Sequence, residues 1–385
     1  NRTFWRWHSK FNAPRGREAE MRALVAEGVY RAGFEGARAF LGTAPSAPEA
    51  PVQEGAIQAK AIVARRHGGP EVLAYEDVPA PRPGPGEVRI RQTAIGVNYI
   101  DVYTRTGYFN LIQPPAVPGM EAAGVVTETG RGVEHLKEGD RVVYACAPPG
   151  AYASIRTMLA DLVVPLPRTI DDRTAAAMAL KGITAYFLLN KVHRLERGET
   201  ALIFAPAGGV GRILVQWARA MGATVIGATS SPDKARAARE AGAHHVVKPG
   251  ERSLEDQVRA LTDGRGADVA FDAVGRDTFD HTVAALKPTG HLVSFGQASG
   301  DIGMRNVSAF AGTSLTLSRP NYGHYTDTRA KVTEALDAVW AALASGAISA
   351  HVGQTFPLAR AAEAHRALED RQTQGSTLLI PEGTE

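Results

Sequence analysis

The sequence predicts an α/β protein in which a doubly wound parallel sheet accompanies a second domain rich in antiparallel strands. Three observations support this fold class. A glycine-rich turn joins a strand pattern to a helix pattern at residues 200–222. Strand and helix patterns then alternate as far as residue 296, as expected for a parallel sheet. Before the turn, residues 59–160 contain short alternating apolar runs, which are typical of antiparallel strands.

The first residues differ in composition from the rest of the chain. The opening stretch, NRTFWRWHSKFNAPRGR, is basic and aromatic and shows no period. Residues 18–41 form an amphipathic helical pattern that glycines weaken, and residues 43–55 are rich in Ala and Pro. We therefore expect residues 1–57 to be a disordered extension and linker, or the product of an upstream reading frame.

The β-rich region begins near Ala59. Strand patterns at KAIVARR, EVRIRQTAIGV, EAAGVVTE, GDRVVYA and GAYASIRTM follow one another, and Pro-Gly clusters at 81–86 and 114–119 punctuate them. Residues 171–190 form a helical pattern with Ala175, Met178, Ala179 and Ile183 on one side. The first domain is expected to close near this helix.

The glycine-rich turn predicts a nucleotide-binding site. Residues 200–204 suit a buried parallel strand, and apolar residues recur at helical spacing from Ile213 to Met221. Between them, Ala205-x-x-Gly208-x-x-Gly211 is a variant of the dinucleotide fingerprint, in which missing side chains admit a pyrophosphate to the helix N-terminus. The alternative is a tight turn between strand and helix that binds nothing.

The end of the next strand favours NADPH over NADH. An NAD-dependent enzyme usually places Asp or Glu there to bind the ribose 2′-hydroxyl. This chain instead has Ser230 and Ser231, followed by Lys234 and Arg236, and these groups suit a 2′-phosphate. The alternative is structural: Ser231 caps a helix, Pro232 is its first residue, and the cations lie on its solvated face. Both interpretations can hold together.

The rest of the chain alternates and then changes pattern. Strands are expected at VIGAT, HHVV, DVAFDAVG and HLVSFG, with helices over DKARAAREAGA and near residues 254–261 and 279–286. The tail carries helical patterns near 329–343 and 359–370, a strand region in GAISAHVGQTFPL and a terminal strand in GSTLLIP. We expect this tail to complete the first domain.

Composition limits the classes of partner and compartment. A chain of 385 residues with 44% hydrophobic and 22% charged residues is typical of a two-domain globular enzyme. The formal net charge of +3 gives no reason to expect nucleic acid or a membrane as a partner. The single cysteine, Cys146, fits a reducing compartment, so we expect a cytoplasmic protein. No apolar run reaches the roughly 18 residues that span a bilayer.

The motifs together resemble a known family. HGGPEVL (67–73), GVNYIDVYTRTGYF, GMEAAGVV, GDRVVYA, LKGITAYFLL, APAGGVG, DAVGRDTF, VSFGQASG and TQGSTLLIP occur in order. Over residues 58–385 the chain resembles the zinc-free, zeta-crystallin-like NADPH quinone oxidoreductases of the medium-chain dehydrogenase/reductase group. The resemblance implies a GroES-like catalytic domain (58–182 and 317–385) split around a Rossmann domain (183–316), with cofactor and substrate between them, and a homodimer.

The resemblance also implies site residues. Asn98 and Tyr103 would border the nicotinamide, with Tyr108 near the substrate, and Thr184 would lie near the carboxamide. The other implied cofactor-binding residues are Gly208, Gly209, Val210 and Gly211 for the pyrophosphate, Ser230, Ser231 and Lys234 for the 2′-phosphate, and Val274, Phe295, Gly296 and Arg371. Each has a structural alternative: Asn98 and Asp101 as caps of a turn, the tyrosines as rim aromatics, Phe295 as core, and Arg371 beside a helix C-terminus.

Two departures from related sequences bear on chemistry. Zinc-dependent relatives have a histidine where this chain has Met120, in Gly119-Met120-Glu121, and a cysteine near Asn98. A thioether and an amide do not replace these zinc ligands, so we expect no metal and no Lewis-acid alcohol oxidation. Close relatives also have Tyr or His where this chain has Pro249, which predicts weaker discrimination for NADPH unless His244 or His245 substitutes.

These observations predict metal-free hydride transfer from NADPH to a planar, electron-poor quinone. Asn98 or a tyrosine hydroxyl would stabilise the developing oxyanion. The first alternative is reduction of an activated C=C bond, which needs a proton donor and hence a more essential tyrosine. The second alternative, from another class, is an NADPH-binding structural or RNA-associated protein.

Overall fold

The computed structural model describes residues 55–250 and 252–383. The expected extension over residues 1–57, including the helical pattern at 18–41, therefore lies almost wholly outside the described residues. Among the residues described, no helix is long and apolar enough to cross a membrane.

Six strands form an all-parallel sheet, as the alternating pattern predicts. They are β8 (Thr200–Phe204), β9 (Thr224–Ala228), β10 (His245–Val247), β11 (Ala267–Asp272), β12 (Leu286–Ser294) and β13 (Thr316–Ser318). Their spatial order is β10-β9-β8-β11-β12-β13, and every neighbouring pair is parallel. The order reverses beside β8, and in such sheets ligands bind at that point, outside the carboxyl ends of the strands.

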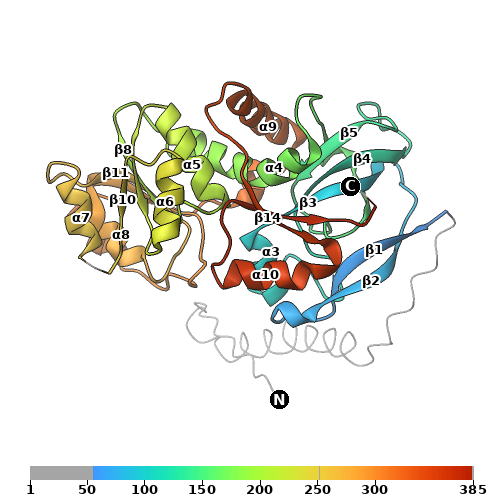
Figure 1. The fold of residues 1–385 in the computed structure, drawn as a ribbon, viewed down its shortest axis with the longest axis horizontal. Helices are drawn as coiled ribbons and strands as arrows, with labels where there is room; N and C mark the ends of the chain where they lie inside the picture. Colours follow the sequence, from blue (N-terminus) through green and yellow to red (C-terminus); the bar gives the residue numbers. More distant parts are fainter. Residues whose placement is uncertain (1–54, 251, 384–385) are drawn as a thin grey trace, which may run out of the picture. The chain divides into compact units, whose positions relative to one another are not determined.

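Helices cover both faces of this sheet, and its central strands β8 and β11 are buried along their whole length. Alternate residues of β8 enter different cores: Ala201 and Ile203 pack with α5 (Gly209–Ala220), whereas Leu202 and Phe204 pack with α7 (Leu254–Ala260) and α8 (Phe279–Ala285). A third helix, α6 (Pro232–Glu240), contributes Ala238 to the α5 side. Figure 1 shows α5 and α6 beside these strands.

Seven strands form the second large sheet. They are β3 (Glu87–Val97), β4 (Glu121–Thr129), β5 (Arg141–Ala145), β6 (Ile155–Leu159), β7 (Val164–Pro165), β14 (Val352–Pro357) and β15 (Ser376–Ile380). The order is β14-β15-β3-β4-β5-β7, with β6 also paired to β3. All pairs are antiparallel except β14 with β15. The C-terminal strand thus pairs directly with β3, and β1 (Ile57–Ala64) and β2 (Leu73–Ala80) form a separate antiparallel hairpin.

The helix α4 (Asp172–Phe187) packs on both assemblies. It contacts β3, β4 and β15 of the seven-stranded sheet and also α5 and α9 (Arg329–Ala344), as Figure 1 shows in its centre. Alanine and glycine occupy much of its length, and almost every residue from Ala175 to Phe187 is buried. The last helix, α10 (Ala361–Glu369), precedes β15. These helices lie close to their predicted positions.

One helix was not predicted. The NYIDVY stretch folds as α3 (Tyr99–Thr106), although we placed it within a strand-rich region. Asn98 is its N-cap, and the Asp101 carboxylate accepts a hydrogen bond of 2.8 Å from the Asn98 backbone N–H. Gly107 ends the helix with φ of +77°, a conformation that glycine adopts without strain. The capping interpretation of Asn98 and Asp101 is therefore correct, and it fixes where the Asn98 side chain lies.

Candidate active site

A cavity of about 1280 Å³ lies at the carboxyl ends of the parallel strands. The residues that immediately follow five of these strands line it: Ala205, Thr229, Ala273, Phe295 and Arg319. The other walls come from α3, α4 and the segment between α10 and β15. Elements of both sheets therefore contribute to one cavity, at the position where parallel α/β sheets bind ligands.

The glycine-rich turn presents free backbone to this cavity. Gly208 is the N-cap of α5 and supplies no side-chain hydrogen bond, so the first turn of the helix keeps unpaired N–H groups. A Cβ on Gly211 would lie 2.1 Å from the carbonyl oxygen of Ala205, and therefore only glycine fits there. Ala205 itself has φ of +49°. This cradle fits a pyrophosphate, because helix N-termini bind anions through backbone N–H groups.

A basic site in the cavity lies near the end of β9. Ser230, Ser231, Lys234 and Arg371 line the cavity beside the end of β9. The Lys234 Nζ donates to the Arg371 carbonyl oxygen at 2.6 Å, and burial together with the Arg371 charge lowers the pKa of Lys234. Neither cation pairs with a carboxylate among the residues that the structure describes. Two uncompensated cations fit a phosphate group at this place.

The structural interpretation of this helix start is also correct. Ser231 caps α6 by accepting from the Lys234 N–H, and Pro232 is the first helical residue. Arg236 is exposed and pairs with Asp233, so it belongs to the surface. Pro249 lines the cavity, whereas His244 and His245 do not. The suggestion that either histidine replaces the missing aromatic contact is therefore wrong: the Nδ1 of His244 instead accepts from the Val225 N–H at 3.0 Å.

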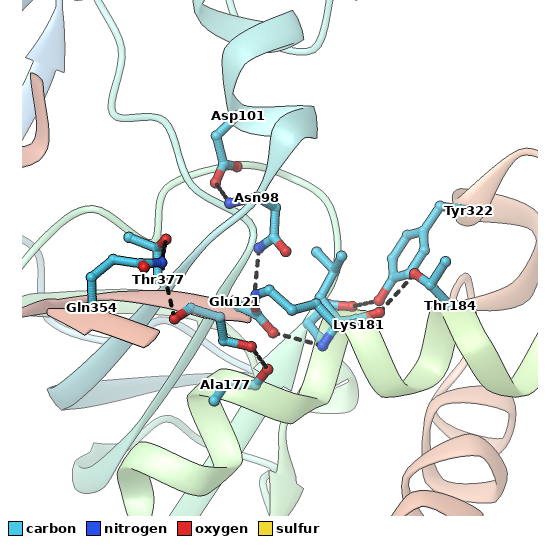
Figure 2. Close-up of polar contacts among 12 residues, drawn as sticks. Asn98, Asp101, Glu121, Ala177, Lys181, Thr184, Tyr322, Gln354 and Thr377 are labelled. Atoms are coloured by element: carbon cyan, nitrogen blue, oxygen red, sulfur yellow. Dashed lines mark hydrogen bonds and ion pairs between the residues drawn. The ribbon is translucent and has the colours of Figure 1, made fainter. Parts of the chain in front are cut away.

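A buried polar cluster joins Asn98 and Lys181, which both line the cavity, to Glu121 (Figure 2). One Glu121 oxygen accepts from the Asn98 amide at 2.7 Å and from the Lys181 ammonium at 2.8 Å, and the other accepts from the Leu180 N–H at 2.6 Å. The Glu121 side chain is 0% exposed and that of Lys181 is 5% exposed. The carboxylate fits because its β-sheet partner is Gly96, where a Cβ would lie 2.1 Å from it. Asn98 is thereby held with its amide at the cavity wall.

A chain of buried hydrogen bonds links two residues of α3, Asp101 and Arg105, through Tyr152 and His365. Tyr152 donates to the Asp101 carboxylate at 2.9 Å, and the Tyr152 hydroxyl lies 3.0 Å from the Nε2 of His365. The Nδ1 of His365 lies 3.1 Å from a guanidinium nitrogen of Arg105. Burial and the neighbouring Arg105 lower the pKa of His365 to about 3, so the ring is neutral. A proton on Nε2 then gives the chain one direction: Arg105 donates to His365, His365 to Tyr152, and Tyr152 to Asp101.

Asp101 is expected to make stability depend on pH. Burial raises its pKa from 3.8 to about 7, so the folded state holds a proton that the unfolded state releases. The free energy of unfolding should therefore fall as pH rises from 3.8 to about 7. Replacing Asp101 with Asn should flatten this slope. Chemical unfolding of both proteins at about pH 5 and about pH 8 measures it. Parallel profiles for the two proteins would contradict this assignment.

Aromatic rings form the wall next to Asn98. Tyr103 stands with its ring centroid 5.1 Å from Tyr99 and from Phe109 and 5.4 Å from Tyr108. The Tyr103 hydroxyl accepts from the Gln297 N–H at 2.9 Å, and burial raises its pKa. Tyr108 donates to the Gln297 side chain at 2.9 Å and is 44% exposed. Among residues 55–250 and 252–383 the Tyr103 O–H therefore has no acceptor, whereas Tyr108 already donates to Gln297 at the rim.

The structure brings the residues predicted from sequence together. Arg236 does not line the cavity, but every residue that the family resemblance implied does: Asn98, Tyr103, Tyr108, Thr184, Gly208, Gly209, Val210, Gly211, Ser230, Ser231, Lys234, Val274, Phe295, Gly296 and Arg371. Sequence reasoning missed Lys181, which also lines it, and Glu121, which holds Lys181. A lysine inside the otherwise apolar helical run MALKGITA is the signal that could have identified the first of these. In the described part of the chain, no three His, Cys, Asp or Glu side chains gather as metal ligands.

Comparisons with known proteins identify the family of this chain. Residues 84–168 match the alcohol dehydrogenase GroES-like domain family, and residues 209–341 match the family described as zinc-binding dehydrogenase. A quinone oxidoreductase of Pseudomonas aeruginosa is 43% identical, over 84% of this chain and 100% of that protein. A 2-haloacrylate reductase of a Burkholderia species is 39% identical, over 84% and 99%. The structure of Escherichia coli quinone oxidoreductase complexed with NADPH matches with a TM-score of 0.81 and 41% identity, over 84% and 100%.

Proposed function

The chain belongs to the NADPH quinone oxidoreductases of the medium-chain dehydrogenase/reductase superfamily, and from this premise we infer that it reduces quinones. It is an oxidoreductase that uses NADPH and acts on a small molecule. The observation that carries the finer proposal is a single cavity with phosphate-binding groups at one end and a tyrosine-lined wall beside a buried amide at the other. A planar acceptor can stack against such a wall of rings.

The cofactor orientation follows from the chemistry of the walls. We propose that the first turn of α5 holds the pyrophosphate and that Ser230, Lys234 and Arg371 hold the 2′-phosphate. Asn98, Tyr103 and Thr184 then border the nicotinamide, with Val274, Phe295 and Gly296 on the far side. NADPH, when bound, supplies the hydride. Because Pro249 offers no hydrogen bond at the adenosine end, we expect a modest preference over NADH.

The protein's own groups stabilise the charge that develops on the acceptor. The Asn98 amide has two N–H bonds and gives one of them to Glu121. The other is available to an oxygen in the cavity that Asn98 lines. The Tyr103 hydroxyl is the second free donor, held in place by the Gln297 N–H. Donors fixed in this way stabilise an oxyanion without reorganising during the reaction.

We further propose that this reaction needs no metal. The Glu121 carboxylate, which holds Asn98, already accepts hydrogen bonds from Lys181, Asn98 and Leu180. The residue before Glu121 is Met120, and the side chain bonded to its carboxylate is the amide of Asn98. A thioether and an amide are poor zinc ligands compared with histidine and thiolate. Positioning and hydrogen bonding therefore carry the chemistry, which suits an electron-poor quinone.

Reduction of an activated C=C bond is the second candidate function. The similarity to a 2-haloacrylate reductase favours it, since that relative is named for an alkene substrate. Alkene reduction requires protonation of a carbon atom as well as hydride transfer, so a specific proton donor becomes essential. Tyr103, with its unengaged O–H, is the donor best placed for that step.

Replacing Tyr103 with Phe separates the two functions. If quinones are the substrates, turnover should fall only a few-fold, because Asn98 still stabilises the oxyanion. If alkenes are the substrates, loss of the proton donor should lower turnover by about 100-fold or more. Replacing Tyr108 with Phe is the matched control, because that hydroxyl is bonded to Gln297 at the rim. Initial rates of each variant with a quinone and with 2-hexenal measure the two effects. A 100-fold loss of quinone turnover in Tyr103→Phe would contradict the quinone proposal.

Other features support proposals about assembly and domains. We propose a homodimer that uses the edge strand β13, because Leu317 on this strand and the nearby Met304 and Val307 are exposed apolar side chains. We propose two domains. The first comprises residues 58–182 and 317–385, and the pairing of β15 with β3 supports joining these two segments. The second comprises residues 183–316, and because β13 pairs with β12 it extends to Ser318.

We also propose that the protein works in the cytoplasm.

A further inference from the structure

We propose that Lys181 is a further cofactor-binding residue, whose ammonium group donates hydrogen bonds to the hydroxyls of the ribose that carries the nicotinamide. This inference rests on the cofactor orientation proposed above, in which the pyrophosphate lies at α5 and the nicotinamide at Asn98.

The first support is an unfilled set of donors on a buried charge. An ammonium group has three N–H bonds, and Lys181 uses one of them for Glu121. Within residues 55–250 and 252–383, this nitrogen makes no second hydrogen bond. The side chain is 5% exposed and lines the cavity. A buried cation with spare donors facing a cavity is best satisfied by ligand oxygens.

The second support is the place of this side chain between the two ends of the proposed cofactor. A Cβ on Gly209 would lie 2.8 Å from the Cδ of Lys181 and 3.0 Å from its Cε, so the lysine passes directly over the first residue of α5. Its ammonium shares one Glu121 oxygen with the Asn98 amide. Figure 2 shows this junction of Asn98, Glu121 and Lys181. The dinucleotide segment between a pyrophosphate and a nicotinamide is the ribose, with two hydroxyls.

The third support comes from α4. Leu180, Lys181, Thr184 and Phe187 all line the cavity, at a spacing that places them on one side of a helix. Thr184 uses its hydroxyl to donate to the Leu180 carbonyl at 2.7 Å. Among these four residues, Lys181 alone therefore offers the cavity charged donors. If Lys181 only formed a structural ion pair with Glu121, replacing it would change the affinity for every cofactor fragment equally. If it binds the ribose, only the fragments that contain this ribose would bind more weakly.

The test compares a ladder of cofactor fragments by calorimetry with Lys181→Met. The ligands are adenosine 2′,5′-bisphosphate, 2′-phosphoadenosine 5′-diphosphate, 2′-phosphoadenosine 5′-diphosphoribose and NADPH. The variant should bind the first two as the parent protein does. It should bind the last two about 10- to 100-fold more weakly, because a hydrogen bond from a charged donor is lost when the ribose is present.

Three further variants make the result decisive. Glu121→Gln with Lys181→Met removes both charges of the buried pair and should show the same ribose-dependent loss if the single variant folds poorly. Lys137→Met, at an exposed site outside the cavity, should bind all four ligands normally. Lys234→Met should weaken all four ligands equally, since each carries the 2′-phosphate.

The outcomes distinguish this inference from the orientation on which it rests. Equal binding of all four ligands by Lys181→Met, or a loss that begins already at the diphosphate or only at NADPH, would overturn the assignment to the ribose. If Lys234→Met binds adenosine 2′,5′-bisphosphate normally, the proposed cofactor orientation itself fails.

Discussion

Replacing Arg105 with Met is expected to lower the free energy of unfolding by about 3 kcal/mol or more. The Arg105 side chain is 1% exposed and makes two hydrogen bonds to the Glu369 carboxylate, at 2.7 and 2.8 Å. It also donates to the Gly68 carbonyl at 3.0 Å and to His365. Methionine fills part of the space but leaves these acceptors without a donor, and a buried acceptor that loses its donor costs far more than an exposed one.

The matched control is a solvent-exposed arginine that also pairs with a glutamate. Arg360 pairs with Glu363 at the protein surface, and exposed pairs of this kind contribute little to stability. Arg360→Met should therefore unfold at the same denaturant concentration as the parent protein, while Arg105→Met unfolds much earlier. Equal midpoints for the two variants would contradict the account of the chain that supports α3.

Replacing Asn98 with Ala is expected to lower kcat for quinone reduction by about 100-fold, the effect typical of losing one donor to a developing oxyanion. The half of the α3 capping box that Asp101 supplies survives this change, because the Asp101 carboxylate accepts from the Asn98 backbone N–H. Glu121 also keeps Lys181 and Leu180 as donors. The loss should therefore appear in turnover, with the thermal midpoint changed little.

Two readouts separate this effect from a structural one. Asn190→Ala removes a half-buried amide that donates to the Tyr186 carbonyl outside the cavity, and it should leave kcat unchanged. The affinity of Asn98→Ala for adenosine 2′,5′-bisphosphate, which does not reach the nicotinamide end, should match that of the parent protein. Unchanged kcat in Asn98→Ala would remove this residue from the chemistry.

The sequence predicted the fold class and the cofactor loop because both depend on local patterns. The run from Thr200 to Phe204 and the glycines that follow it are contiguous, so their period and their missing side chains are visible without a structure. The resemblance added Thr184, Val274, Phe295 and Arg371, which periodicity alone does not single out. All four line the cavity.

The parts that sequence could not predict depend on contacts between distant residues. Glu121 joins Lys181 across 60 positions, and Arg105 meets His365 across 260. No local period marks such partners, because each lies within an ordinary strand or helix. The helix α3 was missed for another reason: its β-branched and aromatic residues favour a strand, and the cap formed by Asn98 and Asp101 overrides that propensity.

The measurement that tests the central claim most directly is steady-state oxidation of NADPH and NADH by the purified protein. The acceptors are 1,4-benzoquinone, 9,10-phenanthrenequinone and 2-hexenal, each with and without EDTA. The account predicts rapid oxidation of NADPH with the quinones, slower oxidation of NADH, little reaction with the enal, and no effect of the chelator. Turnover with 2-hexenal that exceeds turnover with both quinones, or loss of quinone turnover in EDTA, would contradict it.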